Sequence, residues 1–449
     1  MTLMMSVSGV RGLIGQTLTP TLAAELACAF GTLHGPGRVV VGRDSRPSGP
    51  MVESAIVAGL LATGCEPVQV GIVSTPAVGV MVRHCGAVGG VVITASHNPL
   101  MYNGIKFLTA EGRAPAPETA RRIFDVTREK AFQLADVDAL RACVVDESAA
   151  DIHVAETLKI LTPEQITPRR YRIVLDSVNG AGGAEGRQLL EKLGCEVVGL
   201  NEAPTGRFAH PPEPRAEHLE GLCDAVRTHS ADAGFALDPD ADRLAIVDEA
   251  GRYIGEEYTL ALAARHLFTT RPGPAAANLS TSRMIDDLAA AAGGSCRVFR
   301  TPVGEANVVD AIHEHGCVFG GEGNGGIIDP RVGLIRDSLV AMGLVLELMA
   351  VTGKRISELV AELPAYTMIK TQFTCPAERI ARFLEQVRQA HRDERLNDSD
   401  GVRIDLEDGW VHVRGSNTEP IVRIIAEATS RPRADALVEK MKTILDSVE

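Results

Sequence analysis

The sequence predicts an α/β protein with three similar α/β domains, each with a mixed, largely parallel sheet, and a smaller C-terminal α+β domain, around a central cleft. Over residues 1–366, short runs rich in Val and Ile alternate with helical patterns, an order typical of largely parallel sheets. Three predicted strands end in loops rich in polar residues, which suggests a repeated strand-helix-strand unit whose loops converge. After residue 366, strands with helices on one face indicate an α+β domain.

Length sets the number of domains that we expect. A chain of 449 residues is too long for a single hydrophobic core. The pattern of strands and loops divides it into four domains, at residues 1–150, 151–252, 253–366 and 367–449.

Composition restricts the partners and the location of the protein. The net charge of −13 argues against nucleic acid and requires any site for an anion to concentrate basic groups locally. Nine cysteines without a CxxC pair indicate free thiols in a reducing compartment. The N-terminus lacks the pattern of a signal peptide, and the apolar run at residues 339–351 is too short to span a bilayer. We expect a cytoplasmic protein without a membrane partner, as a monomer or a homodimer.

The first domain contains two polar stretches besides its strands. We expect strands at residues 38–42, 66–70 and 89–94 and a helix that begins near Pro50. Ser8-Gly9-Val10-Arg11-Gly12 is interpreted as a glycine-flanked loop that presents Arg11. Asn103-Gly104 predicts a turn, and Lys106 follows it closely. A helical stretch at residues 116–166 leads out of the domain.

The strand at residues 89–94 leads into Thr94-Ala95-Ser96-His97-Asn98-Pro99. This stretch predicts a tight turn, because Asn-Pro favours turns and proline biases the preceding residue away from helix. Ligands collect at the carboxyl ends of parallel strands, where Ser96 would lie. Ser96, beside His97, is therefore a candidate nucleophile or phosphate carrier. The alternative is a turn hydroxyl that bonds its own backbone.

The second and third domains repeat the plan of the first, and the fourth differs. In the second we expect strands at residues 171–176, 195–200 and 233–237, a helix within 180–193 and a surface loop at 201–216. In the third we expect strands at residues 275–279, 296–300 and 317–319 and helices at 282–292 and 304–315. In the fourth we expect helices at residues 377–388 and 437–445 and strands at 402–406, 410–414 and 421–427.

Asp238-Pro239-Asp240-Ala241-Asp242-Arg243 follows the strand at residues 233–237. The alternation of a strand would place the three carboxylates on one side, where they repel one another unless a cation joins them. Ligands that are all oxygen favour Mg²⁺. An EF-hand calcium loop, with Glu249 at its twelfth position, is disfavoured by Pro239, by Arg243 and by the flanking strands. A solvated acidic turn is the remaining alternative.

Two later loops offer groups that bind sugars and anions. Gly321-Glu322-Gly323-Asn324-Gly325-Gly326 carries a carboxylate and an amide for vicinal hydroxyls, and its glycines permit close approach. A mobile glycine linker is the alternative. Arg414-Gly415-Ser416-Asn417-Thr418, with Arg423 nearby, offers a guanidinium, hydroxyls and backbone N–H groups that suit an anion. A hairpin turn is the alternative there.

In this order and at these separations, the four loops resemble those of the α-D-phosphohexomutase family, which includes phosphoglucomutases, phosphomannomutases and phosphoglucosamine mutases. The resemblance extends over the whole chain. It implies an enzyme that interconverts hexose 1-phosphate and hexose 6-phosphate through a phosphoserine and a hexose 1,6-bisphosphate intermediate, which also serves as activator. A small phosphosugar would be the partner, and Mg²⁺ the metal cofactor.

The resemblance also implies roles for individual residues. A phosphate on Ser96 would join Asp238, Asp240 and Asp242 as a metal ligand. Near this centre we expect His97 beside Ser96 and three matching basic residues, Arg11, Lys106 and Arg243. Glu322 and Asn324 would contact the 3- and 4-hydroxyls of the sugar. The phosphate that is not transferred would be held by Arg414, Ser416, Asn417, Thr418 and Arg423.

The chain departs from many family members at three positions. In the loop at residues 321–326, Asn324 replaces a serine and Gly326 replaces a histidine, and Glu305 stands where histidine or aspartate is common. The glycine-rich loop is similar to the archaeal-type branch, whose members accept glucosamine, glucose or mannose phosphates. Two other functions stay open: a hydrolase that uses the same phosphoserine, and a non-catalytic protein that binds sugar phosphates.

Overall fold

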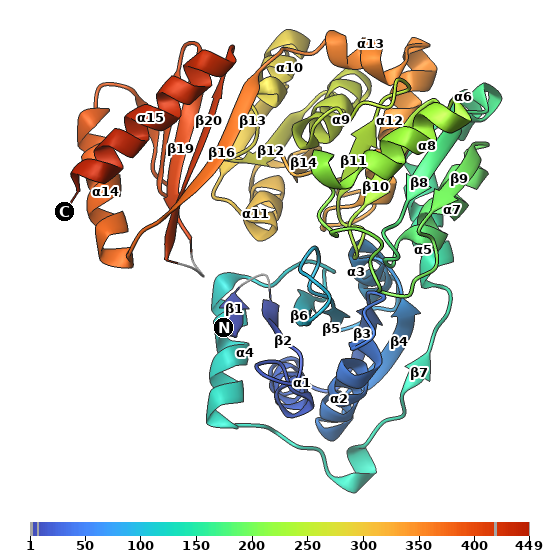
Figure 1. The fold of residues 1–449 in the computed structure, drawn as a ribbon. Coiled ribbons are helices and arrows are strands. Elements are labelled where there is room, and N and C mark those ends of the chain that lie inside the picture. The colour runs from blue at the N-terminus through green and yellow to red at the C-terminus, as the bar shows by residue number, and fades with distance from the viewer. Residues whose placement is uncertain (1–2, 7–8, 417–419, 449) are drawn as a thin grey trace.

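The computed structural model describes residues 3–6, 9–416 and 420–448, which form four sheets in chain order (Figure 1). Ser8, Asn417 and Thr418 of the predicted motifs lie outside these residues. In the view of Figure 1, the first sheet lies below the other three, which follow one another from right to left.

The first sheet has seven strands in the order β1-β2-β6-β5-β3-β4-β7. They are β1 (Met4–Ser6), β2 (Gly9–Leu13), β3 (Arg38–Arg43), β4 (Glu66–Ile72), β5 (Gly89–Ile93), β6 (Tyr102–Thr109) and β7 (Val144–Val145). Strands β5, β3, β4 and β7 are parallel, whereas β6 is antiparallel to β5. One face is covered by α1 (Pro20–His34), α2 (Gly49–Ala62) and α4 (Pro117–Glu129), and the other by α3 (Thr75–His84).

The helices of the first domain share one way of starting. Each of α1 to α4 has proline in its first turn, where the missing N–H has no partner to lose. Thr19 and Ser74 cap α1 and α3, since their side chains accept the backbone N–H groups of Leu22 and Ala77. These signals fix the residues at which the helices begin, and Ser74 is thereby set as the cap of α3.

The second and third sheets have the same topology. The second, in the order β11-β10-β8-β9, contains β8 (Arg172–Asp176), β9 (Glu196–Leu200), β10 (Ala233–Leu237) and β11 (Leu244–Val247). The third, in the order β13-β12-β14-β15, contains β12 (Pro274–Asn278), β13 (Arg297–Thr301), β14 (Phe319–Glu322) and β15 (Gly326–Ile328). In each, three parallel strands are followed by an antiparallel one.

Three sheets therefore repeat one order. Starting from the antiparallel strand, β11-β10-β8-β9 and β15-β14-β12-β13 correspond to β6-β5-β3-β4 of the first sheet. The loops after β5, β10 and β14 thus occupy equivalent places, between the last parallel strand and its antiparallel neighbour. This is the repeat that the strand-helix-strand pattern predicts.

Most helices of the second and third domains share one hydrophobic core. These are α5 (Ala149–Lys159), α6 (Pro163–Ile166), α7 (Gly183–Lys192), α9 (Glu256–Thr270), α10 (Met284–Ala292), α12 (Ser338–Thr352) and α13 (Ile356–Ala361). The other two, α8 (Glu220–His229) and α11 (Glu305–His315), pack in separate, smaller clusters. Helix α12 is buried from Ser338 to Ala350 and packs on α9, α5 and α7. A helix that is apolar all round must be buried. Nevertheless, no helix among the described residues is long and apolar enough to cross a lipid bilayer.

The fourth sheet is antiparallel, in the order β16-β20-β19-β18-β17, as expected for an α+β domain. It contains β16 (Thr367–Thr374), β17 (Arg395–Asn397), β18 (Val402–Leu406), β19 (Gly409–Gly415) and β20 (Ile421–Ala428), with α14 (Ala377–Ala390) and α15 (Arg431–Ser447) packed on it. This domain contacts the third through hydrogen bonds: Arg403 donates to the carbonyl of Leu279 at 2.5 Å, and His412 Nδ1 lies 2.9 Å from Ser280 Oγ.

Three local predictions are wrong. Arg11 lies within β2, not in a loop, because this segment pairs with β6, where Arg11 is opposite Gly104. Asn103-Gly104 lies inside β6 and forms no turn. The stretch at residues 116–166 is helical only in part, since α4 ends where Lys130 adopts a left-handed φ of 52° and α5 begins at Ala149.

The burial of α12 generates a stability prediction. Leu346→Ala removes a fully buried side chain from the core shared by two domains, so we expect the free energy of unfolding to fall by about 2–5 kcal/mol. Val351→Ala lies on the same helix but is 48% exposed, and we expect a change of less than about 0.5 kcal/mol. Urea unfolding followed by circular dichroism measures both free energies of unfolding. Equal losses of stability in the two variants would contradict the role of the buried face of α12 in the shared core.

Candidate active site

The loop that carries Ser96 is held from behind by one arginine. Arg46 is fully buried and pairs with Asp44, with Nε 3.0 Å from Oδ2. Its guanidinium donates to four carbonyls of the loop, those of Ser96 (2.6 Å), Asn98 (2.6 Å), Pro99 (2.8 Å) and Tyr102 (3.0 Å). Ser96 itself has a left-handed φ of 49°, which is uncommon for a residue other than glycine. Sequence reasoning missed Arg46. The signal that could have indicated it is its position just after the strand that ends at Arg43.

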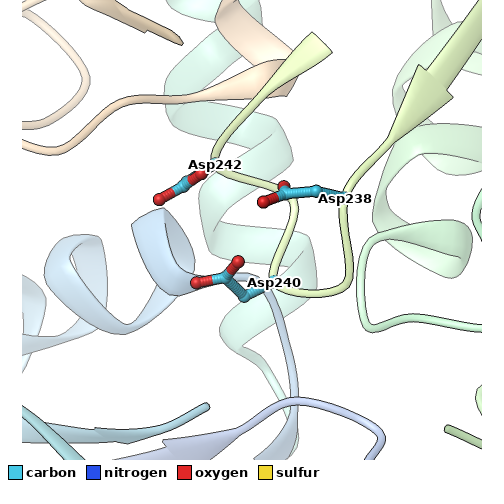
Figure 2. A group of neighbouring side chains, drawn as sticks. All are labelled: Asp238, Asp240 and Asp242. Carbon is cyan, nitrogen blue, oxygen red and sulfur yellow. The ribbon is translucent and has the colours of Figure 1, made fainter. Parts of the chain in front are cut away.

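The three aspartates converge on one side of the loop after β10 (Figure 2). Their ligand atoms lie within 4.8 Å of one another, and each residue is at most 1% exposed. The predicted convergence is correct, but its predicted cause is wrong: the chain turns at Ala241, with a φ of 52°, and does not alternate as a strand. The loop connects β10 to β11 and not two helices, which excludes an EF-hand.

The aspartate loop can hold a metal ion. Within the described residues, Asp240 Oδ1 and Asp242 Oδ1 are buried and accept no hydrogen bond. A buried acceptor without a partner is costly, and a cation between these oxygens would satisfy both. A set of carboxylate oxygens suits Mg²⁺.

Basic groups approach this cluster from two domains. Lys106 Nζ lies 2.7 Å from Asp240 Oδ2 and 3.6 Å from Asp242 Oδ2, and Arg243 Nε lies 3.4 Å from Asp238 Oδ2. Burial, followed by repulsion from Asp242 and Asp240, raises the pKa of Asp238. Burial acts in the same direction on Asp240, but Lys106 and a hydrogen bond from Thr75 outweigh it and lower its pKa. Lys106 and Arg243 therefore offset the repulsion among the three carboxylates.

Ser96 lies at the edge of this cluster. Its Oγ is 3.2 Å from Asp238 Oδ2, 3.3 Å from Arg243 Nη2 and 3.3 Å from His97 Nδ1. Burial and the positive charges of Arg243 and Arg11 lower the pKa of His97 to about 2, so the ring is neutral at pH 7.

Arg11 reaches the same loop from β2, where its Nη1 donates to Asn98 Oδ1 at 2.9 Å. The structure thus brings together Ser96, His97, Arg11, Lys106 and Arg243, the group predicted for the phosphoryl centre.

A second arginine that sequence reasoning missed, Arg336, joins the aspartate loop (residues 238–243) to the glycine-rich loop (residues 321–326). Arg336 Nη2 donates to Asp242 Oδ2 at 2.7 Å, its Nη1 to Glu322 Oε2 at 2.8 Å and its Nε to Glu305 Oε2 at 3.1 Å. Burial opposes its charge, but these three carboxylates raise its pKa well above the usual value. Glu305, the unusual residue of its loop, is therefore a partner of Arg336.

Arg336 also lies against Gly326, the position at which the chain lacks a histidine. A Cβ on Gly326 would lie 2.2 Å from Arg336 Cδ, so the arginine occupies the space that a side chain at this position would need. Beside it, Glu322 accepts a hydrogen bond from Asn278 Nδ2 at 2.7 Å. Asn324 Oδ1 is buried and has no hydrogen-bond partner within the described residues, so it can accept a bond from a ligand hydroxyl.

The predicted phosphate loop lies at the end of β19. Arg414 and Arg423 are opposite each other on β19 and β20, so both guanidiniums project from one face of the sheet. Arg414 Nε lies 3.1 Å from Asp400 Oδ2, and Ser416 N donates to the carbonyl of Ile421 at 2.9 Å. The positions of Asn417 and Thr418 lie outside the described residues.

All four domains line one cleft with a volume of about 1550 Å³. Its lining includes Arg11, Lys106, His97, Arg243, Glu322, Asn324, Arg336, Arg414 and Arg423. Cations and hydroxyl-binding groups thus face one space, which suits a phosphorylated, polyhydroxylated ligand.

A buried serine beside carboxylates and fixed cations is the arrangement that phosphoryl transfer requires, because this chemistry depends on positioning and charge neutralisation. The comparisons with known proteins agree with that class. The four domains of the phosphoglucomutase/phosphomannomutase family match in order, with the α/β/α domains I, II and III at residues 3–134, 152–251 and 256–366 and the C-terminal domain at 371–444.

Whole-chain relatives support the same family. A probable phosphoglucosamine mutase of Methanopyrus kandleri is 40% identical, with 98% of this chain and 96% of the relative covered. A phosphoglucomutase/phosphomannomutase of Thermococcus kodakarensis is 39% identical, with 96% of each covered. The solved structure of a family protein from Burkholderia thailandensis, 27% identical, superposes with a TM-score of 0.87 over 99% of this chain and 98% of that one. The chain belongs to the phosphoglucomutase/phosphomannomutase family and is a phosphohexomutase, an isomerase.

The bridging position of Arg336 generates the second prediction. Arg336→Met leaves Asp242, Glu322 and Glu305 without their shared cation, and breaking such buried pairs costs about 3–5 kcal/mol. Because Asp242 and Glu322 also lose the group that orients them, we expect kcat/KM to fall at least about 100-fold in steady-state assays. Arg331→Met is the control, because Arg331 pairs with Asp329 outside the cleft lining. Wild-type kinetics in the Arg336 variant would show that the bridge has no functional role.

Proposed function

We propose that the enzyme interconverts hexose 1-phosphate and hexose 6-phosphate by passing a phosphoryl group between Ser96 and the sugar. One observation carries this assignment: Ser96 Oγ lies within 3.3 Å of both Asp238 and Arg243, and Ser96 is only 2% exposed. A hydroxyl in that place can carry a phosphoryl group whose charge is neutralised and which bulk water does not reach.

The reaction has two transfers. In the first, the bond between Ser96 Oγ and phosphorus breaks, a bond from phosphorus to the free hydroxyl oxygen of the sugar forms, and the proton of that hydroxyl passes to Ser96 Oγ, which yields hexose 1,6-bisphosphate. The bisphosphate reorients in the cleft, and its other phosphoryl group returns to Ser96. Arg11, Lys106 and Arg243 neutralise the moving group.

Proton transfer and sugar binding involve different groups. Ser96 loses its hydroxyl proton when it is phosphorylated again, and the sugar oxygen that leaves phosphorus takes up a proton in the same transfer. His97 does not act as the base, because its pKa is lowered to about 2 and its Nδ1 lies against the Arg243 guanidinium; the ring positions Ser96 Oγ, 3.3 Å away. Glu322 and Asn324 bind the 3- and 4-hydroxyls. Arg414 and Arg423, with the predicted Ser416, Asn417 and Thr418, hold the phosphate that is not transferred.

We also infer that Asp238, Asp240 and Asp242 hold Mg²⁺, together with a phosphate oxygen on Ser96. When bound, the ion withdraws negative charge from the phosphoryl group. Within the described residues, Asp240 Oδ1 and Asp242 Oδ1 are buried and accept no hydrogen bond, which supports this assignment. Hexose 1,6-bisphosphate is the proposed activator, because it phosphorylates an enzyme that has lost its phosphate.

Glucosamine phosphate is the first substrate that we propose, because the Methanopyrus kandleri relative carries that name. Glucose and mannose phosphates are the alternatives, because the Thermococcus kodakarensis relative is named for them. We also propose a cytoplasmic location, which nine unpaired cysteines support, and a monomer or homodimer.

The carrier role of Ser96 is tested by Ser96→Ala. The variant has no oxygen to phosphorylate, so we expect turnover to be lost and no phosphorylated protein to be detected by mass spectrometry after incubation with bisphosphate. Thermal unfolding should stay close to that of the wild type. Substantial isomerisation by this variant would falsify the carrier assignment.

The reaction is tested by a coupled isomerisation assay with Mg²⁺ and a trace of hexose 1,6-bisphosphate. The 1-phosphates of glucosamine, glucose and mannose are compared side by side, and we expect turnover with the fastest rate on glucosamine. Chelation with EDTA should abolish activity, and added Mg²⁺ should restore it. Inorganic phosphate released in step with substrate consumption would favour a hydrolase, and binding without turnover a non-catalytic protein.

A further inference from the structure

A histidine outside the cleft lies between two buried carboxylates. His153 on α5 is fully buried, with Nδ1 3.1 Å from Glu185 Oε2 and Nε2 2.7 Å from Asp337 Oδ2. Both ring nitrogens face acceptors, so the ring donates at both ends only as an imidazolium. Burial opposes the charge, but Asp337 and Glu185 outweigh it and raise the pKa of His153 to about 10. Glu185 belongs to α7 and Asp337 caps α12, so this ion joins elements of the second and third domains.

One set of hydrogen bonds leads from His153 to Asp240. Glu185 accepts from Ser74 twice, from its N at 2.8 Å and from its Oγ at 2.6 Å. The next residue, Thr75, donates from its N to the carbonyl of Asp240 at 2.9 Å and from its Oγ1 to Asp240 Oδ2 at 2.7 Å. Glu185 thus fixes the start of α3, and the start of α3 holds Asp240.

Contacts on the Nε2 side of His153 lead to Ala241, which follows Asp240 in the aspartate loop. Asp337 Oδ1 caps α12 by accepting from the N–H groups of Leu339 and Val340 at 2.9 and 3.3 Å. Ser338, in the first turn of α12, donates from its Oγ to the carbonyl of Ala241 at 2.7 Å. The two routes from His153 therefore end on adjacent residues of the aspartate loop.

We propose that His153 is a positioning residue for the metal loop. Its charge keeps Glu185 and Asp337 in place, and these two hold Thr75 and Ser338 against Asp240 and Ala241. The loop needs such support, because Ala241 has a left-handed φ and the carboxylates around it repel one another. Without the imidazolium, two buried carboxylates lose their common partner, and both supports of the turn loosen. This role rests on the proposed Mg²⁺ site.

The test compares two buried histidines. His153→Gln removes the charge that joins both supports. His266→Gln is a matched control, because His266 is also buried and pairs with a carboxylate of α12, with Nε2 2.8 Å from Glu347 Oε2. Glu347 leads to the backbone of Thr162, at 2.7 Å, and not to the aspartate loop.

Binding of Mg²⁺ alone is measured by calorimetry on the purified, metal-free full chains. Loss of a residue that orients metal ligands weakens metal binding about 10–100-fold, so we expect a dissociation constant at least about tenfold higher for His153→Gln. For His266→Gln we expect a dissociation constant within about twofold of the wild type. Loss of a buried histidine that is not connected to the aspartate loop should not change the affinity for Mg²⁺.

Each contrary result has a separate meaning. Wild-type affinity in His153→Gln, or equal weakening in both variants, would overturn the positioning role and leave the metal site intact. Failure of the wild-type protein to bind Mg²⁺ would overturn the proposed metal site and the positioning role with it. If His153→Gln does not fold, Ser338→Ala removes only the Oγ bond to Ala241; weaker binding there supports the proposal, and unchanged binding overturns it.

Discussion

The candidate active site depends on keeping three carboxylates together in one buried turn. Their ligand atoms lie within 4.8 Å, a distance at which like charges repel strongly in a protein interior. Cations from three domains oppose this repulsion: Lys106 from the first, Arg243 from the second and Arg336 from the third. Because each cation belongs to a different domain, the site is complete only when the three domains are packed together. The electrostatics of the site and the packing of the domains therefore support each other.

The repeated topology explains how three loops reach one place. In each α/β domain, the last parallel strand ends at the cleft and the chain returns along an antiparallel strand, so the loop between them is fixed at both ends. Each loop contains one residue with positive φ: Ser96 at 49°, Ala241 at 52° and Gly325 at 88°. Only the last is a glycine, and the other two conformations persist because Arg46 and the contacts of the aspartate loop hold them.

The sequence predicted most of the strands and the chemistry of the loops, because both depend on local signals. Because Asp238, Asp240 and Asp242 are close in sequence, they are predicted to cluster whether the backbone is extended as a strand or forms a turn. Arg46 and Arg336 could not be predicted in the same way, since their partners lie on other elements and become neighbours only after folding. The turn predicted at Asn103-Gly104 failed because pairing with β2 and β5 overrides the local preference.

The charges around the triad indicate why the proposed metal ion and the proposed phosphoryl group on Ser96 would stabilise each other. Among the described residues, five carboxylates meet at this end of the cleft, those of Asp238, Asp240, Asp242, Glu305 and Glu322. Four cations accompany them, Arg11, Lys106, Arg243 and Arg336. A divalent cation would turn the single excess negative charge into a positive one, and a phosphoryl dianion on Ser96 would reverse it again. Exchange of one phosphoryl group for another would leave this balance unchanged, as suits the proposed reaction, which begins and ends with the same phosphorylated enzyme.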